Sequence, residues 1–303
     1  MIIAERDTAE SIRHRLRLAS ARRGESAARA LHRYVAERFL YRLGQSHHRE
    51  RLVLKGAALF TLWHRPHRPT RDLDFTAYGP PAVADVQAML TDICATRTAD
   101  EPLDFETDCM TITPIREGAE YDGLRAVIIA RLGFSRIPLQ IDLGFGNAIH
   151  PGPVEVEFPV LLGDDAPRIL AYPSESIVAE KLHAMVLHGA RNSRYKDFHD
   201  VQVMAEELSF DRWTLGTAVA MTFERRVTPV ALALPIALRS DFYADPDRNA
   251  QWRAYLKRSD IFDAPNDFRR IGEVVIPFLA SVWMSVVQDH RAAKRWNPGG
   301  PWI

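Results

Sequence analysis

Two short segments of this chain alternate carboxylate and apolar side chains, and they constrain the fold more than any other feature of the sequence. They are Asp72-Leu73-Asp74-Phe75-Thr76 and Gln140-Ile141-Asp142-Leu143-Gly144. Strict alternation is typical of a strand whose apolar side chains enter a core while its polar side chains line the opposite face. We therefore expect Asp72 and Asp74 on one face of a sheet, and Asp142 on the same face if the two strands are adjacent.

Length and composition limit the class of protein. The chain has 303 residues, of which 47% are hydrophobic and 26% charged, as in ordinary globular proteins of one large or two modest domains. Cys94 and Cys109 are too few for a disulfide framework and are typical of a reducing compartment. Residues 1–17 lack the apolar core of a signal peptide, and the apolar stretch 274–287 is too short for a membrane span. We expect a cytoplasmic protein.

The hydrophobic periodicity predicts three regions. Residues 1–50 have helical spacing, with a break at Gly24, and form a basic helical domain. Residues 51–165 contain the two carboxylate strands and form an α/β core, with further strands expected at 105–115 and 124–132 and a helix at 83–93. Residues 166–303 are predominantly helical. The fold class is therefore α/β, with a helical C-terminal region.

A glycine turn upstream of the first carboxylate strand suggests phosphate binding. Lys55-Gly56-Ala57-Ala58 follows a short apolar stretch and precedes a helical pattern. Glycine at a helix start lets a phosphate approach the backbone, where free N–H groups donate hydrogen bonds. Two carboxylates side by side are costly unless a divalent cation or a cationic side chain neutralises them. With the glycine turn upstream, the pair predicts Mg²⁺ or Mn²⁺ at Asp72 and Asp74 and an NTP at the turn. By itself, this carboxylate pair would suit an exposed edge strand beside Arg71.

Further charged residues extend this candidate site. Asp142 would add a third carboxylate, and such a set can hold two metal ions and activate an attacking hydroxyl. Lys181 could reach triphosphate oxygens, although it could equally be a surface lysine paired with Glu180. Asp197 and Asp200 lie three residues apart near the start of a helix, where acidic residues are also favoured simply by the helix dipole.

Several other chemistries lack sequence support. The histidines, including His47-His48, His64 and His67, have no zinc-ligand spacing with cysteines or with one another. The chain has no nucleophile elbow, no Walker A motif and no dinucleotide fingerprint. These absences disfavour a zinc enzyme, a serine hydrolase, a P-loop NTPase and a dinucleotide-dependent oxidoreductase.

The charge is divided unevenly along the chain. The net charge is zero, which excludes a histone-like or tail-driven nucleic-acid binder. Residues 1–71 nevertheless hold 16 Lys and Arg against 6 Asp and Glu, whereas residues 72–303 hold 23 against 33. This asymmetry indicates either ordinary solvated helix faces or a surface that faces a polyanion, and the sequence leaves both open.

Taken in order, the motifs resemble a known family. They are Leu54-Lys55-Gly56-Ala57-Ala58-Leu59, Arg68-x-Thr70-Arg71-Asp72-Leu73-Asp74-Phe75, Ile141-Asp142-Leu143-Gly144, Glu180-Lys181-Leu182-His183-Ala184 and Arg194-x-Lys196-Asp197-x-x-Asp200. Over residues 51–208 the chain resembles the AbiEii/AbiGii (MenT-like) nucleotidyltransferase toxins. The resemblance implies a DNA-polymerase-β-like nucleotidyltransferase fold and a toxin of a toxin–antitoxin or phage-defence system. It also implies transfer of nucleotides from an NTP, with loss of pyrophosphate, to an acceptor such as the 3′ end of tRNA.

The resemblance also implies residue roles. Catalysis would depend on Asp72, Asp74, Lys181 and Asp197; the metal ions would be bound by Asp72, Asp74 and Asp142; and the NTP would be bound by Lys55, Gly56, Ala57, Arg71 and Lys181. The chain departs from many members of the superfamily at Ala57, where a serine hydroxyl or a second glycine is common. The implied partners are an NTP, tRNA or another RNA, and a cognate antitoxin protein, with no membrane.

Two other functions compete with this interpretation. The same fold could modify a protein or a small molecule instead of RNA. Alternatively, the chain could be a non-catalytic RNA-binding or interaction protein that carries a relic site. The presence of Asp72, Asp74, Lys181 and Asp197 together argues against a relic, because such a protein has no reason to keep carboxylates that repel one another.

Overall fold

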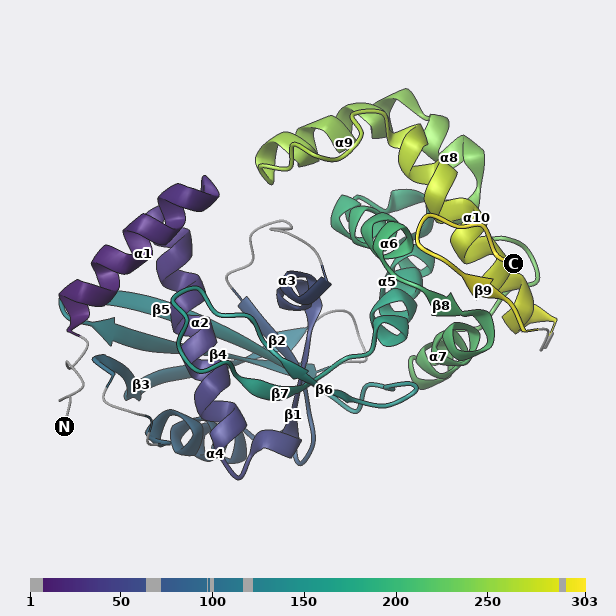
Figure 1. Cartoon of the computed structure of the whole chain (residues 1–303). Coiled ribbons are helices and arrows are strands. Elements are labelled where there is room, and N and C mark those ends of the chain that lie inside the picture. Colours follow the sequence, from purple (N-terminus) through teal and green to yellow (C-terminus); the bar gives the residue numbers. More distant parts are fainter. Residues whose placement is uncertain (1–7, 64–71, 97, 99–100, 117–121, 289–292) are drawn as a thin grey trace. The chain divides into compact units, whose positions relative to one another are not determined.

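The computed structural model describes residues 8–63, 72–96, 98, 101–116, 122–288 and 293–303 (Figure 1). The chain divides into two compact units. Unit 1 comprises Met1–Leu62, Pro69–Gly146 and Val154–Ala171, and unit 2 comprises Trp63–Arg68, Asn147–Pro153 and Tyr172–Ile303.

Unit 1 is built on a seven-stranded mixed sheet with the strand order β3-β4-β5-β2-β1-β7-β6. The strands are β1 (Leu52–Lys55), β2 (Asp72–Ala77), β3 (Leu103–Arg116), β4 (Asp122–Leu132), β5 (Ser135–Phe145), β6 (Val154–Glu157) and β7 (Arg168–Ala171). β2 pairs in parallel with β5, and β1 with β7, while the other neighbours are antiparallel. The expected strands are confirmed, whereas the short strands β1, β6 and β7 were not predicted.

Helices pack against the sheet and against one another in unit 1. They are α1 (Ala9–Arg23), α2 (Ala27–Gln45), α3 (Phe60–Trp63) and α4 (Val83–Ala95), with the 3₁₀ turns η1 (Arg49–Arg51) and η2 (Gly56–Leu59). The Phe39 ring of α2 meets Phe75 of β2 at 6.5 Å between ring centroids, which places α2 on the face of the sheet that Phe75 enters. α1 then packs on α2 through Ile12 and Leu16. Compactness thus groups α1 and α2 with the sheet, whereas the three-part domain division stays a prediction.

Unit 2 is helical, as expected. It contains α5 (Ser174–His188), α6 (Tyr195–Glu207), α7 (Arg212–Arg225), α8 (Ser240–Ala244), α9 (Pro246–Arg258) and α10 (Phe268–Val287), with the 3₁₀ turns η3 (Gly189–Arg191) and η4 (Ile236–Leu238) and a small sheet of β8 (Phe210–Asp211) and β9 (Arg295–Trp296). Phe198 of α6 packs against Phe268 of α10 with ring centroids 5.5 Å apart. These aromatic contacts fix α6, which carries Asp197 and Asp200.

Among the described helices, α10 alone has the length and hydropathy of a membrane span. Its residues are 44% buried over the most apolar window, and it packs against α6, α7 and α8. Phe278 and Trp283 are fully buried in unit 2. α10 is therefore accounted for as a core helix of this unit.

Candidate functional site

The three predicted carboxylates lie on one face of the unit 1 sheet. β2 and β5 are adjacent, and their register places Asp74 beside Asp142 and Asp72 beside Gln140. The alternating residues Leu73 and Ile141 are buried on the other face. Since register partners point to the same side of a sheet, the expectation of a shared carboxylate face is confirmed.

Two cations flank this carboxylate pair. Lys55 of β1 is the register partner of Asp74, and Arg125 of β4 is the register partner of Asp142. Across four neighbouring strands the row therefore reads Arg125, Asp142, Asp74, Lys55. The order places two carboxylates at the centre and one positive charge at each end, so the cations offset part of the repulsion between the carboxylates.

Arg125 makes a bidentate ion pair with Asp142. Its Nε donates to Asp142 Oδ1 at 2.8 Å and its Nη2 donates to Oδ2 at 2.7 Å. Gln140 Nε2 donates to the same two oxygens at 3.3 and 3.4 Å. The hydrogen bonds between Arg125 and Asp142 raise the pKa of Arg125 above its ordinary value, and the negative charges of Asp142, Asp72 and Asp74 add to the effect. A cation at Asp142 must therefore compete with Arg125 for the carboxylate oxygens.

Gly56 lies directly against Asp74. It has a φ of +74°, and a Cβ built at this position would stand 2.2 Å from Asp74 Oδ2. The turn that follows is the 3₁₀ turn η2 and the four-residue helix α3 rather than one longer helix. A glycine is required here both for the backbone conformation and because any side chain would collide with the carboxylate.

A second charged cluster joins α5 to α6 in unit 2. Lys181 Nζ donates to Asp197 Oδ1 at 3.2 Å and to Asp200 Oδ2 at 2.5 Å, and Arg194 Nε donates to Asp197 Oδ2 at 2.9 Å. The side chain of Lys181 is 12% exposed and that of Asp200 is fully buried. Lys181 is therefore not the exposed surface lysine of the alternative interpretation.

Burial and charge act in opposite directions on Asp197. Burial would raise the pKa of Asp197, but the positive charges of Lys181 and Arg194 outweigh it and hold this pKa below its ordinary value. Because the folded pKa is depressed, the stabilisation that this pairing contributes is present above the unfolded pKa of about 4 and is lost as the pH falls through the folded value.

The candidate residues thus form two groups, one in each unit. Asp72, Asp74, Asp142, Lys55 and Gly56 belong to the carboxylate face of unit 1, with Ala57 buried next to Gly56. Lys181 and Asp197 belong to the cluster of unit 2. Arg71 lies outside the described residues. The sequence interpretation did not find Arg125, since only the register of β4 on β5 connects it with Asp142.

Comparison with known proteins identifies the family of this chain. A family model described as nucleotidyl transferase AbiEii toxin, type IV TA system, matches residues 38–274. The chain belongs to this AbiEii nucleotidyltransferase toxin family, as the order of its motifs predicts. A comparison with curated proteins finds no significant match.

Solved structures support the same fold. One similar structure is a Helicobacter pylori protein classed as a nucleotidyltransferase, with 13% identity and a TM-score of 0.51, over 86% of this chain and 97% of that chain. Another is JHP933 from Helicobacter pylori, with 14% identity and a TM-score of 0.50, over 87% of this chain and 95% of that chain. Likeness at this identity concerns the fold, and the expected nucleotidyltransferase fold with a helical C-terminal region is confirmed.

Proposed function

We propose that this chain transfers a nucleotide from an NTP to an acceptor hydroxyl, releases pyrophosphate, and depends on a divalent metal ion. The observation that carries the proposal is the row of side chains in which Asp74, packed against Gly56, stands beside Asp142. Carboxylate oxygens are the ligands that Mg²⁺ and Mn²⁺ prefer, so Asp72, Asp74 and Asp142 fit such an ion. When bound, the ion neutralises triphosphate charge and makes the acceptor hydroxyl easier to deprotonate.

The chain's own residues supply positioning and charge. In this proposal Lys55 and the backbone N–H groups of Gly56 and Ala57 hold phosphate oxygens, and Arg71 assists them. Lys181 contributes positive charge to the triphosphate, while Asp197 and Asp200 fix the position of its ammonium group. Labelled NTPs, supplied one at a time with Mg²⁺ and either total RNA or total protein, test the acceptor class: label in RNA is expected, and label in protein would establish the alternative acceptor.

A substitution at Gly56 tests the turn. Gly56→Ala is expected to lower the transfer rate at least tenfold, because the new Cβ must displace the Asp74 carboxylate. Gly24→Ala is the matched control: Gly24 also has a positive φ, of +67°, but no heavy atom lies within 4 Å of the built Cβ. Both variants should lose about 1 kcal/mol of stability from the backbone conformation. Measuring the transfer rate and the thermal unfolding of both variants separates the backbone effect from the collision with Asp74. Equal transfer rates in the two variants would show that the contact between Gly56 and Asp74 does not matter for activity.

The contact between Arg125 and Asp142 leads to a prediction on metal dependence. Arg125→Gln is expected to lower the Mg²⁺ concentration for half-maximal rate several-fold, since it frees both oxygens of Asp142 and leaves the carboxylates less neutralised. Arg131→Gln on the same strand, where the arginine pairs with Asp104 and Glu106 instead, is the control. The measurement is a Mg²⁺ titration of the transfer rate. If Arg125→Gln needs the same or a higher Mg²⁺ concentration for half-maximal rate, Arg125 does not compete with Mg²⁺ for Asp142.

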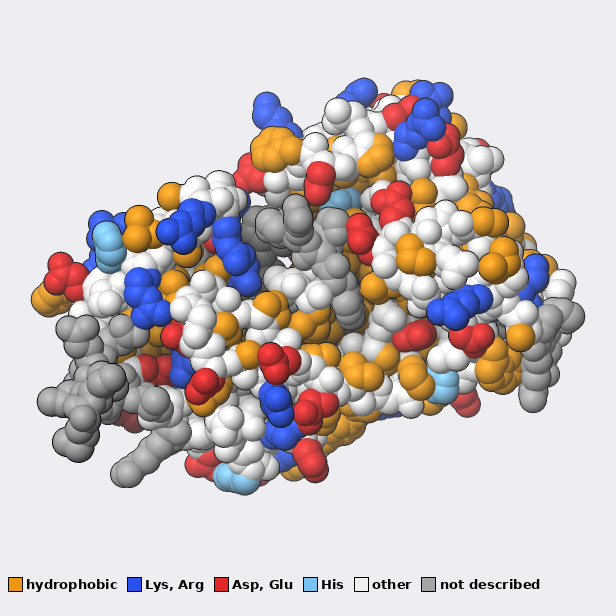
Figure 2. Space-filling view, viewed as in Figure 1, with side chains coloured by type: hydrophobic (Ala, Val, Ile, Leu, Met, Phe, Trp, Pro, Cys, Tyr) orange, Lys and Arg blue, Asp and Glu red, His pale blue; other side chains and the backbone are white. Residues whose placement is uncertain are grey.

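An RNA acceptor, most simply the 3′ end of tRNA, suits the charge of α1. This helix carries five arginines and one acidic residue, Glu10. Arg13, Arg17, Arg22 and Arg23 are exposed, and Figure 2 shows Lys and Arg side chains gathered over α1 and α2. Because the carboxylate face repels a polyanion, a separate basic surface is needed for RNA, and these residues supply one.

Charge reversal on α1 tests the RNA acceptor. The triple variant Arg13→Glu, Arg17→Glu, Arg22→Glu is expected to lower transfer to purified tRNA at least tenfold. The slope of log affinity for tRNA against log salt concentration should become shallower by roughly 0.7–0.9 for each lost phosphate contact. The control is the triple variant Arg253→Glu, Lys257→Glu, Arg258→Glu. These three residues are exposed on α9, and their substitution changes the net charge by the same amount. Transfer that responds neither to salt nor to the α1 substitutions would rule out this RNA-binding surface.

The family is described as the toxin of a type IV toxin–antitoxin system. We propose accordingly that a cognate antitoxin protein opposes this chain in the cytoplasm. Co-expression of this chain with the protein encoded beside it tests the proposal, because growth arrest should follow expression of the toxin alone and should be relieved in the pair.

A further inference from the structure

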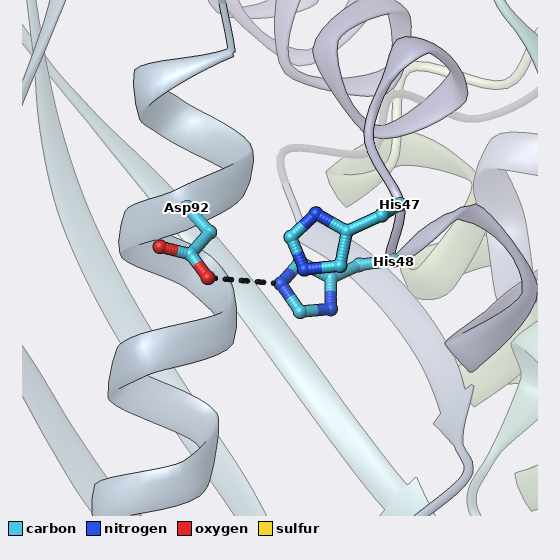
Figure 3. Close-up of side chains that lie close together, drawn as sticks. All are labelled: His47, His48 and Asp92. Carbon is cyan, nitrogen blue, oxygen red and sulfur yellow. Dashed lines mark hydrogen bonds and ion pairs between the residues drawn. The ribbon is translucent and has the colours of Figure 1, made fainter.

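The side chains of two histidines and one carboxylate converge in unit 1 (Figure 3). His47 and His48 lie in the turn between α2 and η1, and Asp92 lies in the last turn of α4. One potential ligand atom from each of the three side chains lies within 4.8 Å of the other two. His48 Nε2 is 3.2 Å from Asp92 Oδ2, and the two imidazole rings are 3.8 Å apart between centroids.

The backbone holds this arrangement in place. Ser46 ends α2: its N–H donates to Leu43 O at 3.1 Å and its hydroxyl accepts from the His48 N–H at 3.2 Å. His48 is buried, whereas His47 and Asp92 are exposed. Because one imidazole is fixed from within the unit and the two other groups face water, an ion can enter from solvent without opening the fold.

The cluster lies on the opposite side of the sheet from Asp74. Phe75, the neighbour of Asp74 in β2, points toward Phe39 of α2, and α4 packs beside α2 on that side. The two places also differ in donor type. Mg²⁺ and Mn²⁺ suit the carboxylates, whereas imidazole nitrogens select borderline transition metals.

We propose that His47, His48 and Asp92 bind one transition-metal ion such as Zn²⁺, Ni²⁺ or Co²⁺. Two nitrogens and one carboxylate oxygen are a suitable donor set, and three protein ligands leave a coordination position for water. The ion would join the end of α2 to α4 and so stabilise unit 1 against unfolding. This site stands independently of the proposed transferase activity.

Arg51 contacts the second ring nitrogen of His48 and opposes metal binding. Its Nη1 lies 3.4 Å from His48 Nδ1, so in the metal-free chain Nδ1 accepts from Arg51 while Nε2–H donates to Asp92. Coordination through Nε2 requires the other neutral tautomer, in which the single ring proton lies on Nδ1 and faces the Arg51 guanidinium, itself a donor. The guanidinium must then turn away. Arg51→Met removes this opposition and is expected to tighten metal binding, whereas it should not do so if the cluster is only a hydrogen-bonded joint.

The experiment uses the full chain carrying Asp72→Asn and Asp74→Asn, so that the carboxylate face does not contribute. Zn²⁺ titration by calorimetry should give one site per chain that EDTA reverses, and Co²⁺ should show the visible absorption of a nitrogen-ligated ion. His47→Ala and Asp92→Asn, both at exposed positions, should each weaken binding at least tenfold, while His14→Ala on α1 should leave it unchanged. Absence of one-to-one binding, or binding that survives both His47→Ala and Asp92→Asn, would overturn the proposal.

Discussion

Asp74→Asn is expected to abolish nucleotide transfer while leaving unit 1 folded. The side chain lies at the centre of the charged row, between Asp142 and Lys55, and is partly exposed. In the proposed role of Asp74 as a metal ligand, its loss should remove about 4 kcal/mol of transition-state stabilisation, which corresponds to about a thousandfold in rate. The unfolding midpoint should remain near that of the wild type or rise, because the substitution relieves repulsion between two carboxylates.

The control for Asp74 is a carboxylate of the same sheet outside the row. Asp104 on β3 is 67% exposed and pairs loosely with Arg131 at 3.6 Å, so Asp104→Asn should retain the wild-type rate. Asp72→Asn should behave like Asp74→Asn. Wild-type transfer by the Asp72→Asn, Asp74→Asn double variant would show that the carboxylate face is not the reaction centre.

Lys181→Met is expected to lower both activity and stability. It leaves Asp200, which is fully buried, and Asp197, which is 4% exposed at its side chain, without the ammonium that they share. Removing one partner of a buried ion pair costs about 3–5 kcal/mol. We expect a fall of at least a hundredfold in NTP use together with a clearly lower unfolding midpoint. Lys181→Arg should restore activity poorly, because a planar guanidinium does not fit the place of a compact ammonium.

A double variant separates the two effects of Lys181. Asp200→Asn added to Lys181→Met removes an uncompensated buried charge, so the unfolding midpoint should recover in part. The transfer rate should stay low if the ammonium acts on the triphosphate. If the transfer rate recovers together with the unfolding midpoint, Lys181 has only a structural role. If Lys181→Met alone leaves the NTP kinetics unchanged, Lys181 is not part of the reaction site.

The sequence predicted those elements whose pattern is local. The alternation around Asp74 and Asp142 identified β2 and β5 and the polar face of each strand, because a period of two fixes which side chains are buried. That the two strands are adjacent, so that the carboxylates share a face, comes from the register of the sheet. α5, from Ser174 to His188, lies in the region that the periodicity predicts to be predominantly helical. The short strands β6 and β7 have only four residues each, which is too few for a periodic signal.

Contacts between distant segments were not predictable in the same way. Arg125 meets Asp142 only through strand register, and Lys181 meets Asp200 only through the packing of α5 on α6. Asp92 approaches His48 from another helix, so no local ligand spacing could reveal it. The residues of the candidate site can thus be predicted from the sequence, whereas the side chains that contact them depend on tertiary structure.

The most direct measurement compares two labels on the same NTP. Purified chain, Mg²⁺ and tRNA are incubated with NTP labelled either at the α-phosphate or at the γ-phosphate. Nucleotidyl transfer forms a bond to the α-phosphorus and expels pyrophosphate. We therefore expect α-label in the RNA, γ-label in pyrophosphate, and neither product with the Asp72→Asn, Asp74→Asn variant. Transfer of the γ-label to the acceptor, or α-label incorporation that persists in that variant, would contradict it.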